Sequence, residues 1–212
     1  MYLPAHFDQQ DPEELATLVK AYPLATMVTL NGNDLVANHI PYLLKGPLVV
    51  GATLKGHVAK NNDVWQHADP DKDILLVFQG SSAYITPNWY PSKQEHHQVV
   101  PTYNYVVVHV YGKLSVYHDR PSKLAIVDHL TQSMEKTRSS TWKVGDAPPD
   151  FIDKMLDAIV GVDVTVTRIE AKWKINQNRS ATDREGVADG LERAALSDSD
   201  KQMSDLVRWG QH

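Results

Sequence analysis

Three basic side chains lie close together in the stretch 51–65, "GATLKGHVAKNNDVW". They are Lys55, His57 and Lys60. The apolar residues around them predict the end of a strand, a turn near Gly56 and then a helix. Lysines are unfavourable at the positive end of a helix dipole unless an anion neutralises them. The stretch therefore predicts either a phosphate site, held by backbone N–H groups and these side chains, or a solvated turn that tolerates its lysines.

Two further groups of side chains suit a planar or phosphorylated ligand. The segment 83–112, "AYITPNWYPSKQEHHQVVPTYNYVVVHVYG", is dense in tyrosine, tryptophan and amide side chains. Such residues line sites for planar ligands, but they also fill barrel cores and dimer interfaces. A second polar cluster follows a late strand: Lys174, Gln177, Asn178 and Arg179. This cluster predicts either a donor array for a phosphate or heterocycle edge, or a solvated loop.

Other chemistries lack their sequence motifs. The ten histidines include no H-x-x-x-H or H-E-x-x-H spacing, and there is no cysteine, so we expect no metal site. A G-x-S-x-G nucleophile elbow is absent, which disfavours a serine hydrolase. G-x-G-x-x-G and Walker-type loops are absent too, which disfavours the Rossmann and P-loop folds.

Composition limits the partners of the chain. Its 212 residues are 42% hydrophobic, which is enough for a sizeable core without disulfides. The formal net charge of −5 provides no overall attraction to nucleic acid, so any DNA contact needs a local patch or a second protein. No apolar run approaches the length of a membrane span. We therefore expect a cytoplasmic protein with no membrane partner.

The elements that must position these side chains are mainly strands. Asp11 and Pro12 predict a helix over 12–22. Turn residues at 31–34 and 80–82 separate the expected strands, which cover 24–30, 35–44, 47–54, 74–80, 83–86 and 99–117.

The second half of the chain predicts helices around one late strand. Outer helices are expected over about 120–160, the second of them closing at Gly161. The apolar phase of the strand 161–175 changes near residues 167–168, which predicts a β-bulge or a change of packing partner. A polar and helical segment over about 176–212 completes the chain.

This order of elements argues against a doubly wound sheet, in which strands and helices alternate. It predicts a mainly β protein with helices, of the α+β class: an antiparallel barrel with peripheral helices. We found no repeat or long linker and expect a single domain over 1–212.

Five segments taken together resemble the PaiB family: "MYLPAHF", "LKGHVAKNN", "FQGSSAYITPNWY", "VVPTYNYVVVHVYG" and "INQNRSATDREGV". The resemblance spans nearly the whole chain. It implies an FMN-binding split barrel, similar in fold to pyridoxamine-phosphate oxidase, with the flavin between the subunits of a homodimer. The family name also implies a negative transcriptional regulator. Tyr103 and the pair Ile175–Asn176 depart from residues that are common in the family.

The resemblance implies positions for the ring and ribityl chain of FMN. By position, Asn38, His39 and Ile40 lie along the isoalloxazine, while Ala52 and Thr53 approach the ribityl chain.

The other implied contacts involve the phosphate and the partner subunit. Lys55, His57 and Lys60 would surround the phosphate, and Gln79 and Ser81 resemble contacts from the partner subunit. The late polar motif is implied to reach the same cleft: Lys174, Gln177, Asn178 and Arg179.

Three functions remain open at this point. The chain is a flavin-linked regulator acting through DNA or a regulatory protein partner, an FMN-dependent oxidoreductase, or a haem-binding split barrel. Because a flavin itself performs hydride chemistry, an enzyme of this kind needs no catalytic motif, and we assign no catalytic residue. Apolar residues on both faces of the strand 104–111, "NYVVVHVY", also predict a homodimer.

Overall fold

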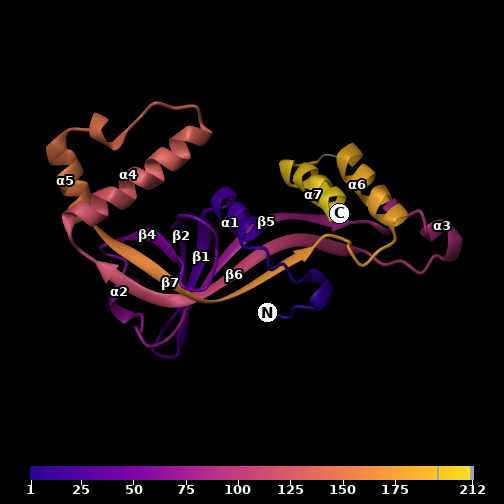
Figure 1. Cartoon of the computed structure of the whole chain (residues 1–212), viewed down its shortest axis with the longest axis horizontal. Coiled ribbons are helices and arrows are strands. Elements are labelled where there is room, and N and C mark those ends of the chain that lie inside the picture. Colours follow the sequence, from indigo (N-terminus) through magenta and orange to yellow (C-terminus); the bar gives the residue numbers. More distant parts are fainter. Residues whose placement is uncertain (195, 211–212) are drawn as a thin grey trace. The chain divides into compact units, whose positions relative to one another are not determined.

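The computed structural model describes residues 1–194 and 196–210 (Figure 1). Its helices and strands follow in this order: η1 Ala5–Phe7, α1 Pro12–Ala21, β1 Leu24–Asn31, β2 Asp34–Pro41, β3 Leu43–Leu44, β4 Thr53–Ala59, α2 Val64–His67, β5 Ile74–Ile85, η2 Pro87–Trp89, α3 Lys93–His96, β6 Thr102–Tyr117, α4 Arg120–Thr137, η3 Val144–Asp146, α5 Pro149–Asp157, β7 Ile159–Lys174, α6 Ala181–Ala194 and α7 Asp198–Trp209.

The chain forms two compact units. Unit 1 comprises Met1–Gln10, Gln79–Val108 and Glu170–His212, and unit 2 comprises Asp11–Phe78 and His109–Ile169. Three of the four divisions fall inside β5, β6 and β7, so each of these strands supplies residues to both units.

Seven strands form one sheet in the order β2-β1-β5-β6-β7-β4-β3. The pairs β1–β2, β1–β5, β3–β4 and β4–β7 are antiparallel. Asn31 pairs with Asp34 at the predicted first turn, where Gly32 adopts the left-handed region at φ 61° that a tight hairpin needs. The sheet and its accompanying helices confirm the predicted α+β class.

Within unit 2 the sheet curls so that β2 approaches β4. A Cβ added to Gly56 on β4 would lie 3.0 Å from the backbone oxygen of Pro41, the last residue of β2. Tyr42 follows and is buried, with its hydroxyl donating to Met27 Sδ at 3.0 Å. Burial raises the pKa of the Tyr42 phenol far above its ordinary value, so the ring remains neutral.

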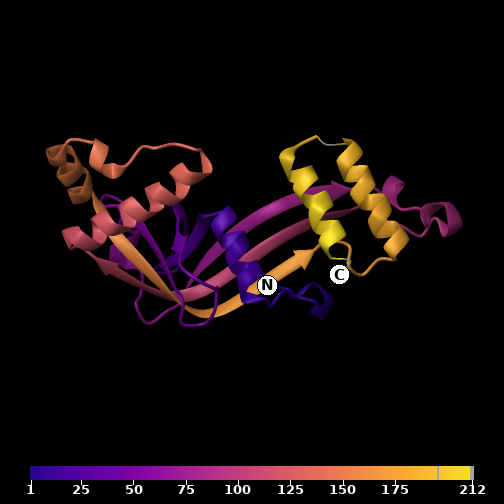
Figure 2. The same cartoon turned by 45° about the horizontal axis from the view of Figure 1, so that its top comes forward.

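Unit 1 is built around the pair α6–α7, which Figures 1 and 2 show lying side by side. Ser204 Oγ on α7 donates to the backbone oxygen of Ala188 on α6 at 2.9 Å. A Cβ added to Gly190 would lie 2.3 Å from the ring of Trp89, so α6 needs glycine there to admit the indole.

The predicted helix start after Gly56 is wrong. β4 runs through it from Thr53 to Ala59, and α2 covers only Val64–His67. Leu54, Gly56 and Val58 are buried on one side of the strand, and Gly56 pairs with Val162 of β7. Pairing with β7 therefore outweighed the helical spacing that the sequence suggested, and the three basic residues lie outside any helix N-terminus.

Three other predicted boundaries are also wrong. Residues 48–52 lie outside any strand, and the N–H of Ala52 donates to the backbone oxygen of Val49 at 3.0 Å across a turn with Gly51 at φ 88°. β5 continues through the predicted turn at 80–82, where the N–H of Ser82 donates to Ser199 Oγ of α7 at 3.0 Å. Gly161 lies in β7 rather than closing α5, because its missing side chain admits the ring of Tyr117.

The predicted change of packing partner in β7 is confirmed. Up to Val166 the buried valines have even residue numbers. The next two residues are exposed, and the buried residues Ala171 and Trp173 that follow have odd numbers, so the opposite side of the strand is now buried. The division between the units falls between Ile169 and Glu170, so the two phases of the strand pack in different units.

Candidate functional site

The predicted site residues divide between the two units. Unit 2 holds those expected along the flavin and its phosphate: Asn38, His39, Ile40, Ala52, Thr53, Lys55, His57 and Lys60. Unit 1 holds those expected from the partner subunit and the late polar motif: Gln79, Ser81, Lys174, Gln177, Asn178 and Arg179.

Asn38 on β2 has an unpaired amide donor. Its Oδ1 accepts a hydrogen bond from Asn62 Nδ2 at 2.7 Å, whereas its own Nδ2 is buried and has no hydrogen-bond partner. The neighbouring His39 is exposed and Ile40 is buried. Because an unpaired buried donor costs free energy, Asn38 suits a ligand that offers a carbonyl oxygen, as an isoalloxazine ring does.

Ala52, just before β4, and Thr53, its first residue, help to fix the register of the strand. Ala52 and Thr53 are half-buried, and the backbone oxygen of Ala52 accepts from the N–H of Val166 at 2.9 Å. Thr53 pairs with Thr165 of β7. This pairing orders the backbone at the start of β4, which the resemblance assigned to the ribityl chain.

Lys55 on β4 already has an acidic partner. Its Nζ donates to Asp163 Oδ2 on β7 at 2.5 Å, while Asp163 Oδ1 is buried without a hydrogen-bond partner. The ammonium also lies 5.9 Å from the centroid of the Tyr117 ring. Burial, followed by the charges of Asp163 and Asp119, raises the pKa of Tyr117 to about 12. An anion bound at Lys55 would therefore compete with Asp163.

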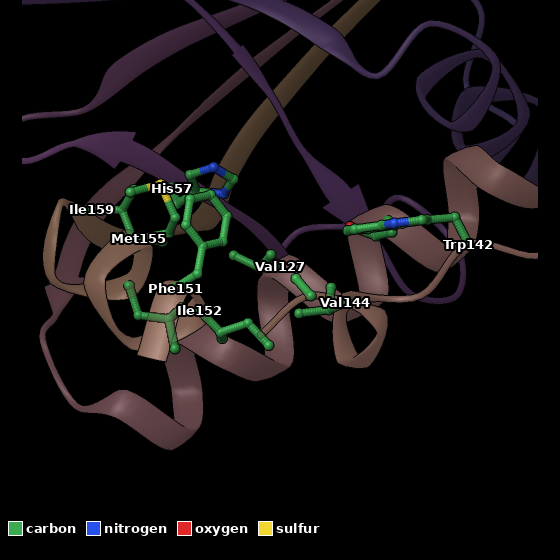
Figure 3. A pocket seen from close by; sticks show the side chains of 11 residues that line it. His57, Val127, Trp142, Val144, Phe151, Ile152, Met155 and Ile159 are labelled. Carbon is green, nitrogen blue, oxygen red and sulfur yellow. The ribbon is translucent and has the colours of Figure 1, made fainter. Parts of the chain in front are cut away.

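His57 lies on the same side of β4 as Lys55 but has an apolar environment. It lines a cavity of about 240 Å³ together with residues of α4 and α5 (Figure 3). Its Nδ1 is buried without a hydrogen-bond partner, and burial lowers the pKa of its imidazole. The neutral ring is favoured in this environment, and a neutral imidazole is a weak partner for a phosphate.

Lys60 lies in the turn after β4 and is exposed. Its N–H donates to the backbone oxygen of Ala158 at 2.8 Å, and its own backbone oxygen accepts from Trp65 Nε1 at 3.2 Å. Across residues 1–194 and 196–210, its ammonium has no ion-pair partner. The turn is thus fixed while the cation remains available to an anion.

The β5 candidates in unit 1 differ in exposure. Gln79 is exposed, and its Nε2 donates to the backbone oxygen of Val106 at 3.4 Å. Ser81 is buried, and its Oγ donates to Gln202 Oε1 of α7 at 2.5 Å. Ser81 therefore attaches β5 to α7 within unit 1.

The late polar motif is held by unit 1 itself. Lys174 Nζ donates to Thr102 Oγ1 and, at 2.7 Å, to the backbone oxygen of Tyr103. Burial, and then the charge of Lys172, lowers the pKa of Lys174. These contacts fix the ammonium at the start of β6.

The rest of the motif turns back on the strand that it follows. Gln177 accepts from the N–H of Ile175 at 2.8 Å and donates to the backbone oxygen of Trp173, so both ends of its amide are engaged. The Arg179 guanidinium lies 5.1 Å from the centroid of the Tyr90 ring, whereas Asn178 is exposed.

Sequence reasoning missed a buried polar network beside this motif. Asn104 Nδ2 donates to Asn176 Oδ1, and Asn176 Nδ2 donates to the Tyr90 hydroxyl at 2.9 Å. Asn176 adopts φ 66°, which asparagine tolerates better than most residues. The sequence did contain one signal for this network, because Asn176 departs from the residue that is common at this position in the family.

Asp163 was also missed. It lies between two valines in "GVDVTV", at one of the polar positions that alternate with them. Its contact with Lys55 depends on the β4–β7 register, which the sequence does not reveal.

Within residues 1–194 and 196–210, no group of three or more His, Asp or Glu side chains is arranged to hold a metal ion. Over the same residues, no helix has both the length and the apolar character needed to cross a membrane.

Comparison with known sequences identifies related proteins. Residues 1–168 match a family described as "Putative FMN-binding domain". The chain is 31% identical over 217 residues to the protein named "Protease synthase and sporulation protein PAI 2" from Bacillus subtilis, covering 98% of this chain and 96% of the relative. It is also 27% identical to an uncharacterised protein of Emericella nidulans, over 98% of this chain and 96% of the relative.

Solved structures share the fold at low sequence identity. The flavocytochrome Anf3 from Azotobacter vinelandii matches with a TM-score of 0.57 at 12% identity, covering 79% of this chain and 69% of that protein. An FAD- and haem-binding protein from Mycobacterium smegmatis matches with a TM-score of 0.56 at 18% identity, covering 79% and 73%. These similarities support the split-barrel fold.

Proposed function

This chain belongs to that family of FMN-binding domains, with FMN as its cofactor, and we propose that it acts as a flavin-linked negative transcriptional regulator of PaiB type. The regulatory part is supported by the Bacillus subtilis relative, whose name connects it with protease synthase and sporulation and which matches 98% of the chain. The main observation in support of a flavin site is the unpaired, buried Nδ2 of Asn38, which lies on the strand assigned to the isoalloxazine.

The residues present fit an FMN molecule at both ends. Asn38 offers an amide donor to the ring, and Lys60 offers an unpaired ammonium to the phosphate. Lys55 is a second phosphate partner once it exchanges its contact with Asp163. We do not assign His57 to the phosphate, because its neutral ring lies in an apolar cavity.

FMN supplies hydride or single-electron transfer when it is bound, and the protein needs only to hold and shield it. Asn38 would orient the ring, Ala52 and Thr53 would present ordered backbone to the ribityl chain, and Lys60 would bind the phosphate. His39 and Ile40 would border the ring.

We further propose a homodimer of single-domain chains, in which Gln79 and Ser81 contact the partner's flavin and the late polar motif reaches the same cleft. The support is the resemblance rather than β6, because Val106, Val107 and Val108 are all buried within one chain. Sedimentation equilibrium should give twice the mass of 23.8 kDa. A monomer at every concentration would contradict the shared site.

The flavin assignment is tested by the absorbance spectrum of protein incubated with FMN or with haem and then freed of unbound ligand. We expect bound flavin bands after incubation with FMN and their weakening in Asn38→Leu. Retained haem bands without flavin bands would instead favour the haem-binding alternative.

The regulatory role is tested by gel-shift titration on DNA upstream of the chain's own gene, with and without FMN. Direct regulation predicts sequence-selective binding that weakens with salt, because phosphate contacts release counterions, and that changes when FMN is present. Weak, sequence-indifferent binding would contradict direct DNA regulation. The net charge of −5 gives the chain no overall attraction to DNA, so selective binding needs a local patch.

A further inference from the structure

A cavity of about 240 Å³ lies in unit 2 between β4 and the helices α4 and α5. Figure 3 shows His57, Phe151 and Met155 at one end of it and Trp142 at the other. Val127 of α4 lies between these ends. The cavity is thus elongated, with an imidazole at one end and apolar side chains along its length.

Large apolar side chains at this cavity remain exposed to solvent. Trp142 is 48% exposed, Phe151 53% and Met155 43%. Scattered exposed apolar residues are common, but three around one hollow indicate a surface that a ligand covers. The ring of Phe151 and the flexible thioether of Met155 suit a flat aromatic molecule.

The cavity favours a neutral ligand. Among the described residues that line it there is no Lys, Arg, Asp or Glu, so a charged molecule would lose hydration without gaining a counter-charge. The imidazole of His57 has an unpaired Nδ1, and burial lowers its pKa. A hydroxyl both donates and accepts, so it can pair with the neutral ring in either tautomer.

The walls of the cavity are held in place without a ligand. Lys123 of α4 is buried, and its Nζ donates to the backbone oxygen of Leu156 in α5 at 2.6 Å. Arg120 at the start of α4 donates through Nε to Asp153 Oδ1 at 2.7 Å. Because both contacts join α4 to α5, a ligand would enter a largely preformed space.

We propose that this cavity binds a neutral aromatic molecule carrying a hydroxyl group, with its rings against Val127, Phe151 and Met155 and its hydroxyl at the His57 imidazole. The site is separate from the proposed flavin site, because it uses neither Asn38 nor the two lysines. Its occupant is therefore a second ligand, either a substrate or a signal.

The probe is 1-naphthol, compared with naphthalene and with naphthalene-1-sulfonate by isothermal titration calorimetry. We expect 1-naphthol to bind about tenfold more tightly than naphthalene, the scale of one hydrogen bond, and the sulfonate to bind least. Tighter binding of the sulfonate would overturn the proposal, because it would indicate an anion site.

The position of the probe is read from the methyl NMR signals of the five methionines. The Met155 signal should shift with 1-naphthol, while those of the buried Met27 and Met203 should not. Shifts confined to Met27, Met203 or the other methionines, or no shift at all, would place the probe elsewhere and overturn the proposal.

Two variants and one competition complete the test. His57→Leu should remove the preference for 1-naphthol over naphthalene, and Ala147→Trp should block both probes by filling the cavity. His67→Leu, outside the cavity, should change neither.

The titrations are then repeated with excess FMN. Unchanged 1-naphthol affinity supports a separate site, whether or not FMN binds. Displacement of 1-naphthol by FMN would show that the cavity belongs to the flavin site and would overturn the proposal.

Discussion

Lys55 on β4 and Asp163 on β7 are partners both in the strand register and through their side chains, with Nζ 2.5 Å from Oδ2. Their side chains are 46% and 20% exposed, so solvent screens the pair only in part. Asp163 Oδ1 has no hydrogen-bond partner, so the carboxylate is incompletely satisfied. At the same time, the carboxylate neutralises Lys55, which is a candidate residue for binding the phosphate. The pair therefore opposes the binding of an anion.

Replacing Asp163 with asparagine should strengthen FMN binding, because Lys55 would no longer be neutralised. The free energy of unfolding should change by about 1 kcal/mol or less, as is usual for partly exposed ion pairs. FMN titration and urea denaturation measure the two effects. Asp153→Asn, which breaks the exposed pair with Arg120, is the matched control and should leave FMN affinity unchanged. Unchanged or weaker FMN binding in Asp163→Asn alone would exclude Lys55 from the phosphate site.

The stability of the protein should depend on pH through His57. Burial lowers the pKa of its imidazole below the ordinary 6.5 in the folded state, so the unfolded chain takes up this proton first as the pH falls. Stability should therefore fall as the pH drops through 6.5 towards the lower folded pKa and level off below it. His57→Leu should lack this part of the pH dependence. An NMR titration that finds the His57 pKa at or above 6.5 would contradict the buried, neutral ring.

Gly112 on β6 should not tolerate alanine. The added Cβ would lie 2.5 Å from the backbone oxygen of Thr165, and backbone cannot move aside as a flexible side chain can. We expect Gly112→Ala to lower the free energy of unfolding by about 1–3 kcal/mol, the usual range for overpacking. Gly145→Ala, where a Cβ meets nothing within 4 Å, is the control and should be nearly neutral. Equal stability of the two variants in urea denaturation would refute the close approach of β6 and β7.

Local patterns in the sequence predicted most elements. Asp11 accepts hydrogen bonds from the N–H groups of Glu13 and Glu14 at the start of α1, as an N-cap should. Asp119 likewise accepts from the N–H of Ser122 at the start of α4. The change of apolar phase after Val166 correctly indicated a change of packing partner, because that pattern is imposed by the core itself.

The errors arose where a distant strand or helix decided the local structure. Gly56 appeared to be a turn residue, yet pairing with Val162 makes it part of β4. Ser82 appeared to end a strand, yet β5 continues through it and its N–H donates a hydrogen bond to Ser199 Oγ of α7. No local pattern could predict these partners, since each lies about 100 residues away in the chain.

The candidate site residues remain a prediction. The resemblance suggested Asn38 and Lys60, and both have unpaired polar groups. It could not show that Asp163 occupies Lys55 or that His57 faces apolar residues, because both facts depend on register and on the packing of α4 and α5.

The most direct test of the flavin site is a comparison of FMN and riboflavin affinities in the wild type and in Lys60→Glu, measured by quenching of flavin fluorescence. Riboflavin lacks the phosphate, so the comparison separates that end of the site from ring binding and from general loss of stability. We predict that Lys60→Glu weakens FMN binding roughly 10- to 100-fold, the scale of one charge-assisted hydrogen bond, and leaves riboflavin binding nearly unchanged. A folded Lys60→Glu variant that binds FMN as well as the wild type, or loses both ligands equally, would contradict a phosphate site at this turn.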